Sequence, residues 1–592
     1  MLIPGWLAFP DALVGALVAP LAFAILISGF DDLVVDAARA ASYFKRRFGK
    51  AAPEPPPAGI HKRIAIFVPL WREHAVIGRM LEHNIAAIDY DNYDFFVGAY
   101  PNDEPTLDAV REIESRYPHV HVAICPHDGP TSKADCLNWI YQRMLLHSDV
   151  NGVQFDIVVT HDAEDLIDPG ALKILNNYAD RFDMVQIPVL PLPTPLWDVV
   201  HGVYCDEFAE FQLKDMPARQ AMGSFIPSSG VGTGYTRAAM DKMATSAANR
   251  VFEPECLTED YENGMRLHAL GCSQAFVPLR ANARRAVITR EYFPRTLRAA
   301  IRQRTRWITG IALQSWERHG WKGNAGDIYW FWRDRKGLLG NPLSLVSNVV
   351  FVYGAATSLW APVSRLTHLL DWRIAAATLA LLVYRTAIRI FCVGRMYGWG
   401  FAAGAPLRCV CANFINSVAG MRALVRFARA KVLHEPLVWL KTEHGYPLRA
   451  ALLEHKRTLA DILTSSGYLD QHRLRKALDM KPAEMNLGDY LVSQSLLSAD
   501  QLLHALSLQH GLPAGPVLPE EVSPAAARTL PRHVVRSWRV LPYRIVAGSL
   551  HVATPDTPSD EMTRELRGFT ALEMRFQLVT SENFERLLEL LQ

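Results

Sequence analysis

The chain has 592 residues, of which 50% are hydrophobic and 21% are charged, and its formal net charge is +2. This length exceeds what one hydrophobic core supports and predicts several domains. The apolar share lies between that of a soluble enzyme and that of a transporter, so we expect a protein partly embedded in a membrane. Lysines and arginines occur only in short clusters, which argues against the basic face of a nucleic-acid-binding protein.

The cysteines indicate a compartment rather than a metal site. There are eight of them, with no CxxC pair and no cysteine and histidine spacing suited to zinc. We therefore expect free thiols in a reducing compartment.

Residues 1–58 are predicted to form an N-terminal membrane anchor and a linker. The apolar run 13–30 lacks a basic segment before it, which is typical of a retained anchor and not of a cleaved signal peptide. The basic residues of 45–50 should face the cytoplasm and leave the N-terminus outside. The PEPPP segment 53–57 is predicted to be a stiff linker.

Residues 59–320 are predicted to form an α/β domain. Short β-rich runs alternate with helical stretches such as 76–88, which indicates a mostly parallel, doubly wound sheet. Ligands of such sheets bind at the carboxyl ends of the strands. Asp103 and Asp162 stand at such ends, directly after apolar runs.

Residues 321–448 are predicted to form transmembrane and interfacial helices. The runs 342–362 and 372–393 are each close to the length of one membrane span. The run 401–427 carries several arginines and asparagines, which favours an interfacial or re-entrant helix. Two spans after the α/β domain would also return the C-terminus to the cytoplasm, whereas three would leave it outside.

The tail, residues 449–592, contains an internal repeat. Leu459-Ala460 aligns with Leu487-Gly488 at an offset of 487 − 459 = 28 residues, and further leucines then coincide. The leucine spacing predicts a helical hairpin for each repeat. β-like stretches and a last helix follow position 513, so we expect an independent α+β domain.

A set of motifs occurs in order along the α/β domain. Asp162-Ala163-Glu164 would place two carboxylates at a strand end, where they could hold a metal ion against a pyrophosphate, although such a triplet alone is more often a turn or a cap. The other members are Val68 to Glu73, Tyr100 to Glu104, Lys133-Ala134-Asp135, Gly232-Thr233-Gly234, Thr258-Glu259-Asp260 and Gln303 to Trp307 (QRTRW).

The joint presence of DAE, TED and QxxRW resembles the family 2 glycosyltransferases, specifically the membrane-embedded subgroup of cellulose and hyaluronan synthases. The resemblance covers roughly residues 60–320. It implies a GT-A-like doubly wound domain inserted between transmembrane helices, and an inverting transfer from a nucleotide-diphosphate sugar.

The resemblance also implies roles for single residues. The donor-binding positions are Pro69, Glu73, Asp103, Lys133 and Asp162. Asp103 would contact the base or ribose, and Lys133 the same region or the phosphates. The residues alone leave open that Glu73 is an ordinary helix N-terminal carboxylate and Lys133 a surface lysine.

The remaining roles concern the metal and the reaction. Asp162 and Glu164 would form a variant DxD element that holds Mg²⁺ or Mn²⁺, with glutamate where the synthases usually have aspartate. Glu259 and Asp260 are the catalytic carboxylates, with Asp260 as the general base. Gln303, Arg306 and Trp307 would form the acceptor floor, with Trp307 stacked on a sugar ring and Arg306 near the diphosphate.

The tail resembles the N-terminal domain of type II secretion and pilus ATPases, which implies a receptor for cyclic di-GMP. The implied contacts are Arg457, Leu459, Leu463, Leu487, Gly488, Leu491 and Gln509. The first repeat departs from the pattern at Ala460, where glycine is expected, and at Lys481, which matches Gln509. The residues alone leave open that the hairpins only pack together and dock the tail.

With the WLKTEH segment 439–444, the arrangement resembles the bacteriophage adsorption protein B family of inner-membrane glycosyltransferases. We expect a multi-pass protein of the bacterial inner membrane with cytoplasmic catalytic and C-terminal domains. It would polymerise a UDP-sugar onto a growing glycan under control by cyclic di-GMP, with an export partner in the periplasm or outer membrane. The alternatives are single transfer to a lipid acceptor, and an inactive scaffold that acts as a nucleotide-controlled membrane partner or phage-entry factor.

Overall fold

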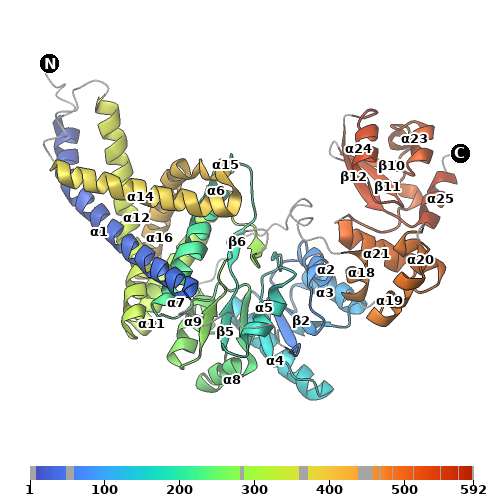
Figure 1. Ribbon diagram of the computed structural model, residues 1–592, viewed down its shortest axis with the longest axis horizontal. Helices are drawn as coiled ribbons and strands as arrows, with labels where there is room; N and C mark the ends of the chain where they lie inside the picture. Colours follow the sequence, from blue (N-terminus) through green and yellow to red (C-terminus); the bar gives the residue numbers. More distant parts are fainter. Residues whose placement is uncertain are drawn as a thin grey trace. The chain divides into compact units, whose positions relative to one another are not determined.

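A computed structural model gives the fold of the chain (Figure 1). It describes residues 8–48, 59–279, 286–358, 371–435, 437, 458–465, 468–482, 485–510, 512–546, 549–570 and 572–589. The chain divides into two compact units. One contains residues 1–77 and 92–446, and the other contains 78–91 and 447–592.

The first unit is built on a seven-stranded sheet. The strand order is β3 (Val120–Ile124), β2 (Tyr93–Ala99), β1 (Ile64–Pro69), β4 (Ile157–Thr160), β7 (Thr233–Thr236), β5 (Met184–Gln186) and β8 (Gln274–Phe276). All neighbours are parallel except β7, which runs antiparallel to both β4 and β5. A second small sheet pairs β6 (Val189–Pro191) with β9 (Thr289–Glu291).

The helices follow the strands in alternation along the chain, as in a doubly wound fold. They are α2 (Ile77–Ala87), α3 (Glu104–Arg116), α4 (Lys133–Asn151), α5 (Ala171–Tyr178), α6 (Val199–Glu210), α7 (Met216–Ala221), α8 (Arg237–Ser246), α9 (Glu259–Ala269), α10 (Leu297–Ile308) and α11 (Ser315–His319). Two π-helical segments, η2 (Phe211–Asp215) and η4 (Thr309–Gln314), join α6 to α7 and α10 to α11. Helix α4 covers β1 and β2 and packs into a core with Phe67, Phe96 and Tyr235.

The predicted α/β fold class is confirmed. The short β-rich runs that predicted strands correspond to β1 to β5 and β10 to β12, and the helix expected at 76–88 is α2. Strands β7, β8 and β9 were not predicted; β7 (TGYT) and β9 (TRE) are short and largely polar, so no apolar run marks them. The Gly232-Thr233-Gly234 motif enters β7, the antiparallel strand in the middle of the sheet.

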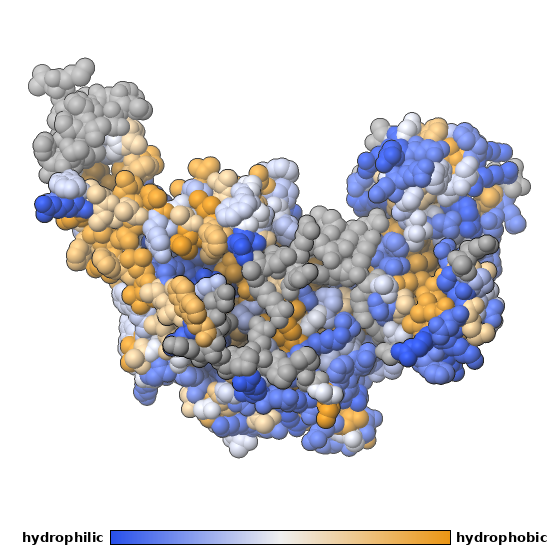
Figure 2. Space-filling model, in the orientation of Figure 1, coloured by the Kyte–Doolittle hydropathy of each residue, from blue (hydrophilic) through white to orange (hydrophobic). Residues whose placement is uncertain are grey.

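Three helices in the described part of the chain are long and apolar enough to cross a membrane: α1 (Ala8–Arg47), α12 (Ala325–Ser358) and α14 (Trp372–Tyr397). Figure 2 shows hydrophobic side chains gathered over them. Phe23, Phe351 and Leu379 are among the large apolar side chains exposed there. Two spans were expected near these positions after the catalytic domain, and α12 begins well before the expected 342.

Charged side chains of these three helices meet around Asp31 and Asp32 of α1, and we call this cluster the charged level. Arg333 of α12 donates to Asp31 of α1 at 2.6 Å and to Asp32 at 3.2 Å. Arg385 of α14 forms an ion pair with Asp32 at 2.5 Å. The apolar stretch precedes this charged level in α1 and α14 and follows it in α12. Three helices that cross the same membrane would place their paired charges in this way, near one surface.

Helix α16 (Ala405–Leu433), preceded by the short α15 (Trp399–Ala402), contains the polar run 401–427. It is not among the candidate spans of the described residues. Arg408 donates to both carboxylate oxygens of Asp206 in α6, at 2.8 and 2.7 Å, and Asn416 donates to Glu207 at 3.0 Å. These polar groups of α16 therefore contact the α/β unit.

The second unit contains the repeat and an α+β part. Helices α18 (Leu459–Ser465) and α19 (Gln471–Met480) are followed by α20 (Leu487–Ser493) and α21 (Ala499–His510). The starts of α18 and α20, and those of α19 and α21, differ by the predicted 28 residues (487 − 459 and 499 − 471). Their leucines share a core, to which Ala86 of α2 also belongs.

The rest of the unit is a three-stranded sheet, β10 (Leu541–Val546), β11 (Ser549–Thr554) and β12 (Glu573–Leu578), with its own core. Its helical segments are η6 (Pro519–Glu521), α22 (Pro524–Ala527), α23 (Arg532–Ser537), α24 (Asp560–Leu566) and α25 (Ser581–Glu589).

The ion pair between Arg408 and Asp206 gives a first prediction. Both side chains are almost fully buried, so Arg408→Ala leaves an uncompensated carboxylate and should destabilise the protein by about 3–5 kcal/mol. Thermal unfolding of the detergent-solubilised protein measures the loss, and Arg408→Ala with Asp206→Ala should restore part of it. Arg429→Ala, at an exposed pair with Glu435, is the control. An Arg408→Ala protein as stable as the parent contradicts the role of this pair.

Candidate active site

A cavity opens at the carboxyl ends of the central strands, as doubly wound sheets predict. Most of the residues that the motifs singled out line it: Pro69, Glu73, Lys133, Asp162, Glu164, Glu259, Asp260, Gln303, Arg306 and Trp307. They come from segments separated by more than two hundred residues of sequence. The fold therefore gathers the DAE, TED and QxxRW motifs around one space.

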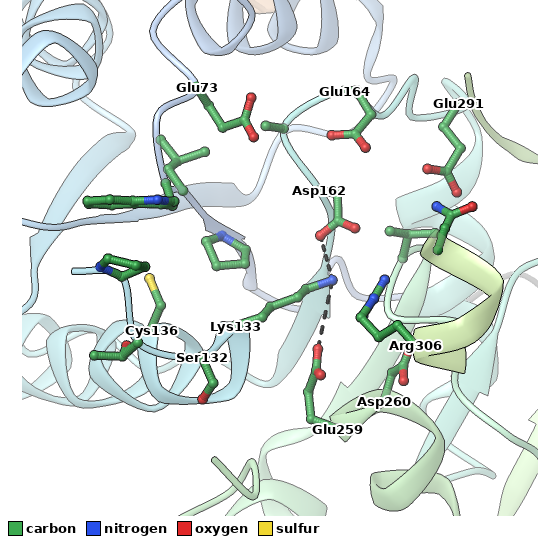
Figure 3. A pocket seen from close by; sticks show the side chains of 18 of the residues that line it. Glu73, Ser132, Lys133, Cys136, Asp162, Glu164, Glu259, Asp260, Glu291 and Arg306 are labelled. Carbon is green, nitrogen blue, oxygen red and sulfur yellow. Dashed lines mark ion pairs between the residues drawn. The ribbon is translucent and has the colours of Figure 1, made fainter. Parts of the chain in front are cut away.

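The DAE triplet lies in a turn that the buried side chain of Asp165 stabilises. Asp165 is fully buried, and its carboxylate accepts from the Asp162 N–H at 3.0 Å and contacts His161 Nδ1 at 2.7 Å. Burial raises the pKa of Asp165 to about 6. With this anchor below the turn, the side chains of Asp162 and Glu164 are turned toward the cavity (Figure 3).

Lys133 lies between the two acidic motifs (Figure 3). It is the first residue of α4, whose N-cap Ser132 accepts from the Asp135 N–H. Its ammonium is 2.5 Å from Asp162 and 4.0 Å from Glu259. Burial opposes the charge, but these carboxylates outweigh it and raise the pKa of Lys133. Lys133 is thus not a surface lysine and joins DAE to TED.

The TED carboxylates stand in the first turn of α9, where the helix dipole favours negative charge. Burial, together with the neighbouring Asp260, raises the pKa of Glu259 to about 7. Burial likewise raises the pKa of Asp260. A carboxylate whose pKa is raised binds a proton more readily, which suits a general base.

Gly230 makes room for the side chain of Asp260. Its φ is +77°, and a Cβ there would lie 2.8 Å from Asp260 Oδ2. The backbone can approach this carboxylate only without a side chain.

Helix α10 contributes the other wall. Gln303 Oε1 and Arg306 Nε are buried without a hydrogen-bond partner among the described residues. Buried polar atoms of this kind call for a ligand or water. Trp307 packs edge-on against Phe293, with ring centroids 6.2 Å apart and planes at 72°. This wall therefore offers unused polar atoms beside aromatic rings.

The end of β1 forms the wall at Pro69 and Glu73, joined by Trp71. Asp103 is buried, and its carboxylate accepts from the Arg72 N–H at 2.5 Å, where Arg72 has a φ of +55°. Asp103 is not among the described residues that line the cavity. Its contact with a nucleotide stays a prediction, and in this structure it holds the backbone of the wall.

The cavity fits a divalent cation by its chemistry. Asp162 and Glu164 offer carboxylate oxygens, which Mg²⁺ and Mn²⁺ prefer, and a diphosphate and water would complete the coordination.

Several lining residues were not predicted, among them Ser132, Cys136, Ser229, Glu291 and Phe293. Glu291 and Phe293 belong to the Arg290-Glu291-Tyr292-Phe293 segment at the end of β9, which carries no motif. Burial and the nearby Asp165 raise the pKa of Glu291 well above its usual range. A carboxylate placed just before two aromatic residues was the one signal available in the sequence.

The predicted cyclic di-GMP contacts divide into two groups. Leu463 and Leu491 are fully buried in the helical core, and Leu459 and Leu487 are partly buried against it. Gly488 permits close packing, because a Cβ there would lie 2.6 Å from Leu502.

The other contacts are polar. Gln509 is partly buried near the end of α21, and Arg457 lies outside the described residues. In the first repeat, Lys481 donates to the carbonyls of Pro482 and Met485 at 2.9 and 2.6 Å.

Two family models match the chain. The model described as "Glycosyltransferase like family 2" matches residues 61–310, which contain the cavity. The model described as "MshEN domain" matches residues 510–592 in the tail. The chain is also similar to solved structures: the mannosyltransferase PcManGT from Pyrobaculum calidifontis in complex with GDP-mannose and Mn²⁺ (16% identity, 69% of this chain, 99% of that chain, TM-score 0.43) and MshE with cdg (27% identity, 22% and 96%, TM-score 0.20).

The chain is 32% identical over 567 residues to bacteriophage adsorption protein B of Escherichia coli K12 and to bacteriophage N4 adsorption protein B of Escherichia coli O157:H7. In both cases the match covers 90% of this chain and 76% of the relative. The predicted family is thereby confirmed: the chain belongs to the bacteriophage adsorption protein B family, with a family 2 glycosyltransferase domain and an MshEN domain.

Proposed function

We propose that this protein is an inverting glycosyltransferase of the bacterial inner membrane that uses a UDP-sugar and builds a polysaccharide. The observation that carries the proposal is the single cavity in which Lys133 joins Asp162 to the Glu259 and Asp260 pair, opposite Arg306. Perturbed carboxylates and cations that converge in one cleft mark functional sites.

The donor would lie along the DAE element. Asp162 and Glu164 would hold Mg²⁺ or Mn²⁺, which neutralises charge on the diphosphate. Lys133 and Arg306 add positive charge in the same cavity. Both cations stabilise the charge that develops on the leaving group as its bond to the sugar lengthens.

The acceptor would enter over the wall formed by Gln303 and Trp307. Its hydroxyl oxygen attacks C1 of the donor sugar while its proton passes to the Asp260 carboxylate. The bond from C1 to the phosphate oxygen breaks, the nucleoside diphosphate leaves, and the configuration at C1 inverts. The raised pKa of Asp260 favours this proton transfer.

The base is tested by Asp260→Asn. This variant should lower turnover by about 10²–10⁴-fold, because it removes the proton acceptor, while UDP-sugar affinity stays nearly unchanged. Radiolabelled product formed by membranes with a panel of UDP-sugars measures turnover. Asp108→Asn, at an exposed carboxylate of α3, is the matched control.

Full turnover of Asp260→Asn would remove Asp260 from the mechanism. Absence of transfer in the parent protein with every donor would favour the inactive scaffold.

The metal is tested by chelation. EDTA should abolish transfer, and added Mg²⁺ or Mn²⁺ should restore it, because the diphosphate otherwise faces carboxylates without a neutralising cation. Asp162→Asn should raise the metal concentration that gives half-maximal rate. Undiminished synthesis in EDTA contradicts the metal assignment.

The orientation follows from the basic residues of 45–50 and 333–336 and from the common charged level of α1, α12 and α14. Reporter fusions at position 60 and after position 445 should report the cytoplasm, and a fusion near Arg365 should report the periplasm. A periplasmic signal from the fusion after 445 would mean that α16 spans the membrane. This topology would also place the cavity where cytoplasmic UDP-sugars are available, and the product would need an envelope export partner.

Regulation by cyclic di-GMP rests on the MshEN domain and the helical repeat. Because Ala86 lies in the core of the repeat, the full-length protein is the right sample for calorimetry. We expect micromolar or tighter binding, weakened at least about tenfold by Arg457→Ala or Gln509→Ala, since charge-assisted and amide hydrogen bonds to the dinucleotide are lost.

Arg473→Ala, at an exposed side chain of α19, is the control for these variants. Gly488→Leu is a poor choice, since it would also disturb packing against Leu502. No heat from a folded protein at high dinucleotide concentration would leave the repeat as a docking module.

A further inference from the structure

Glu291 is held at the cavity by backbone pairing. It ends β9, where it pairs with Pro191 of β6, and the Leu192 N–H donates to its carbonyl at 2.9 Å. The preceding Arg290 forms a bridge with Leu166, through N–H to O distances of 2.8 and 3.1 Å. Since Leu166 follows the DAE turn, this bridge fixes the position of Glu291 relative to that element.

The side chain of Glu291 points into the cavity beside Glu164 (Figure 3). Glu73, Ser132 and Cys136 lie on the opposite side of Asp162 in the same view. If Asp162 marks the diphosphate and the β1 end marks the nucleoside, Glu291 lies on the side where the sugar of the donor is attached.

The chemistry of this position suits a sugar ring. The structure forms no hydrogen bond or ion pair to the Glu291 carboxylate among the described residues, although this side chain is half-buried in the cavity wall. Phe293, two residues on, lines the same cavity and packs near Trp307. A carboxyl group forms hydrogen bonds with neighbouring hydroxyl groups in either protonation state, and aromatic rings cover the apolar face of a sugar.

We propose that Glu291 binds hydroxyl groups of the donor sugar and so determines which sugar is used. This role rests on the proposed function, because it requires a UDP-sugar in the cavity. A site built to hydrogen-bond a hydroxyl discriminates strongly against a donor that lacks it or presents it in another direction.

Calorimetry without acceptor, on the full-length protein in detergent with Mn²⁺, tests the proposal. The ligands are UDP, UDP-glucose, UDP-galactose and UDP-N-acetylglucosamine. Glu291→Ala should weaken binding of the preferred UDP-sugar by about 10- to 100-fold and leave UDP affinity within about twofold, because UDP lacks the sugar. Glu291→Gln keeps the shape and one acceptor oxygen and should lie between Glu291→Ala and the parent.

The outcomes separate the two claims. Equal loss for UDP and UDP-sugars, with a higher Mn²⁺ requirement, would make Glu291 a metal ligand and overturn the proposal. Parent-like UDP-sugar affinity in both variants would also overturn it and leave the proposed function standing. A parent protein that binds neither UDP nor any UDP-sugar would overturn both. Glu255→Ala, at an exposed carboxylate, is the matched control, and thermal unfolding shows that each variant is folded.

Discussion

The ion pairs of Lys133 are the constraint on which the cavity depends. Asp162, Glu164, Glu259, Asp260 and Glu291 line one enclosed space, and burying this many carboxylates together is costly. Lys133 contacts Asp162 and approaches Glu259, and thereby links a strand end to a helix start. The residual acidity has a consequence for binding: the site favours ligands that arrive with cations or hydroxyl groups, as a metal-bound nucleotide sugar does.

The second wall of the cavity depends on contacts of α10 with α6 and α16. Arg304 of α10 donates to Asn416 of α16, pairs with Glu207 of α6, and lies 4.3 Å over the ring of Tyr204. Gln303 and Arg306 thus belong to a helix, α10, that packs against both α6 and α16. The contacts of Arg304 with Glu207 and Asn416 thereby hold α10, and with it this wall of the cavity, against α6 and α16.

The sequence predicted those parts of the site in which a family motif follows directly after a recognisable apolar strand. DAE follows the apolar strand β4, so its place at a strand end was predicted, whereas TED was recognised only as a motif and the structure places it at the start of α9. Glu291 and Phe293 were not predicted, because long-range pairing of very short strands brings them to the cavity. Asp103 was predicted as a nucleotide contact from its motif. In the structure, its carboxylate accepts a hydrogen bond from the backbone N–H of Arg72.

The two helical hairpins of the tail share their apolar core but differ in the polar residues at their ends. Leu463 and Leu491 occupy equivalent places in one core, and the helices keep the 28-residue offset, so apolar spacing alone specified the duplicated hairpins. The polar ends of the two repeats differ. Lys481 is engaged with carbonyls of its own loop, whereas its counterpart Gln509 is an amide that both donates and accepts hydrogen bonds. Packing therefore tolerates a change at this position, and only the second repeat has the glutamine that the resemblance predicts as a dinucleotide contact.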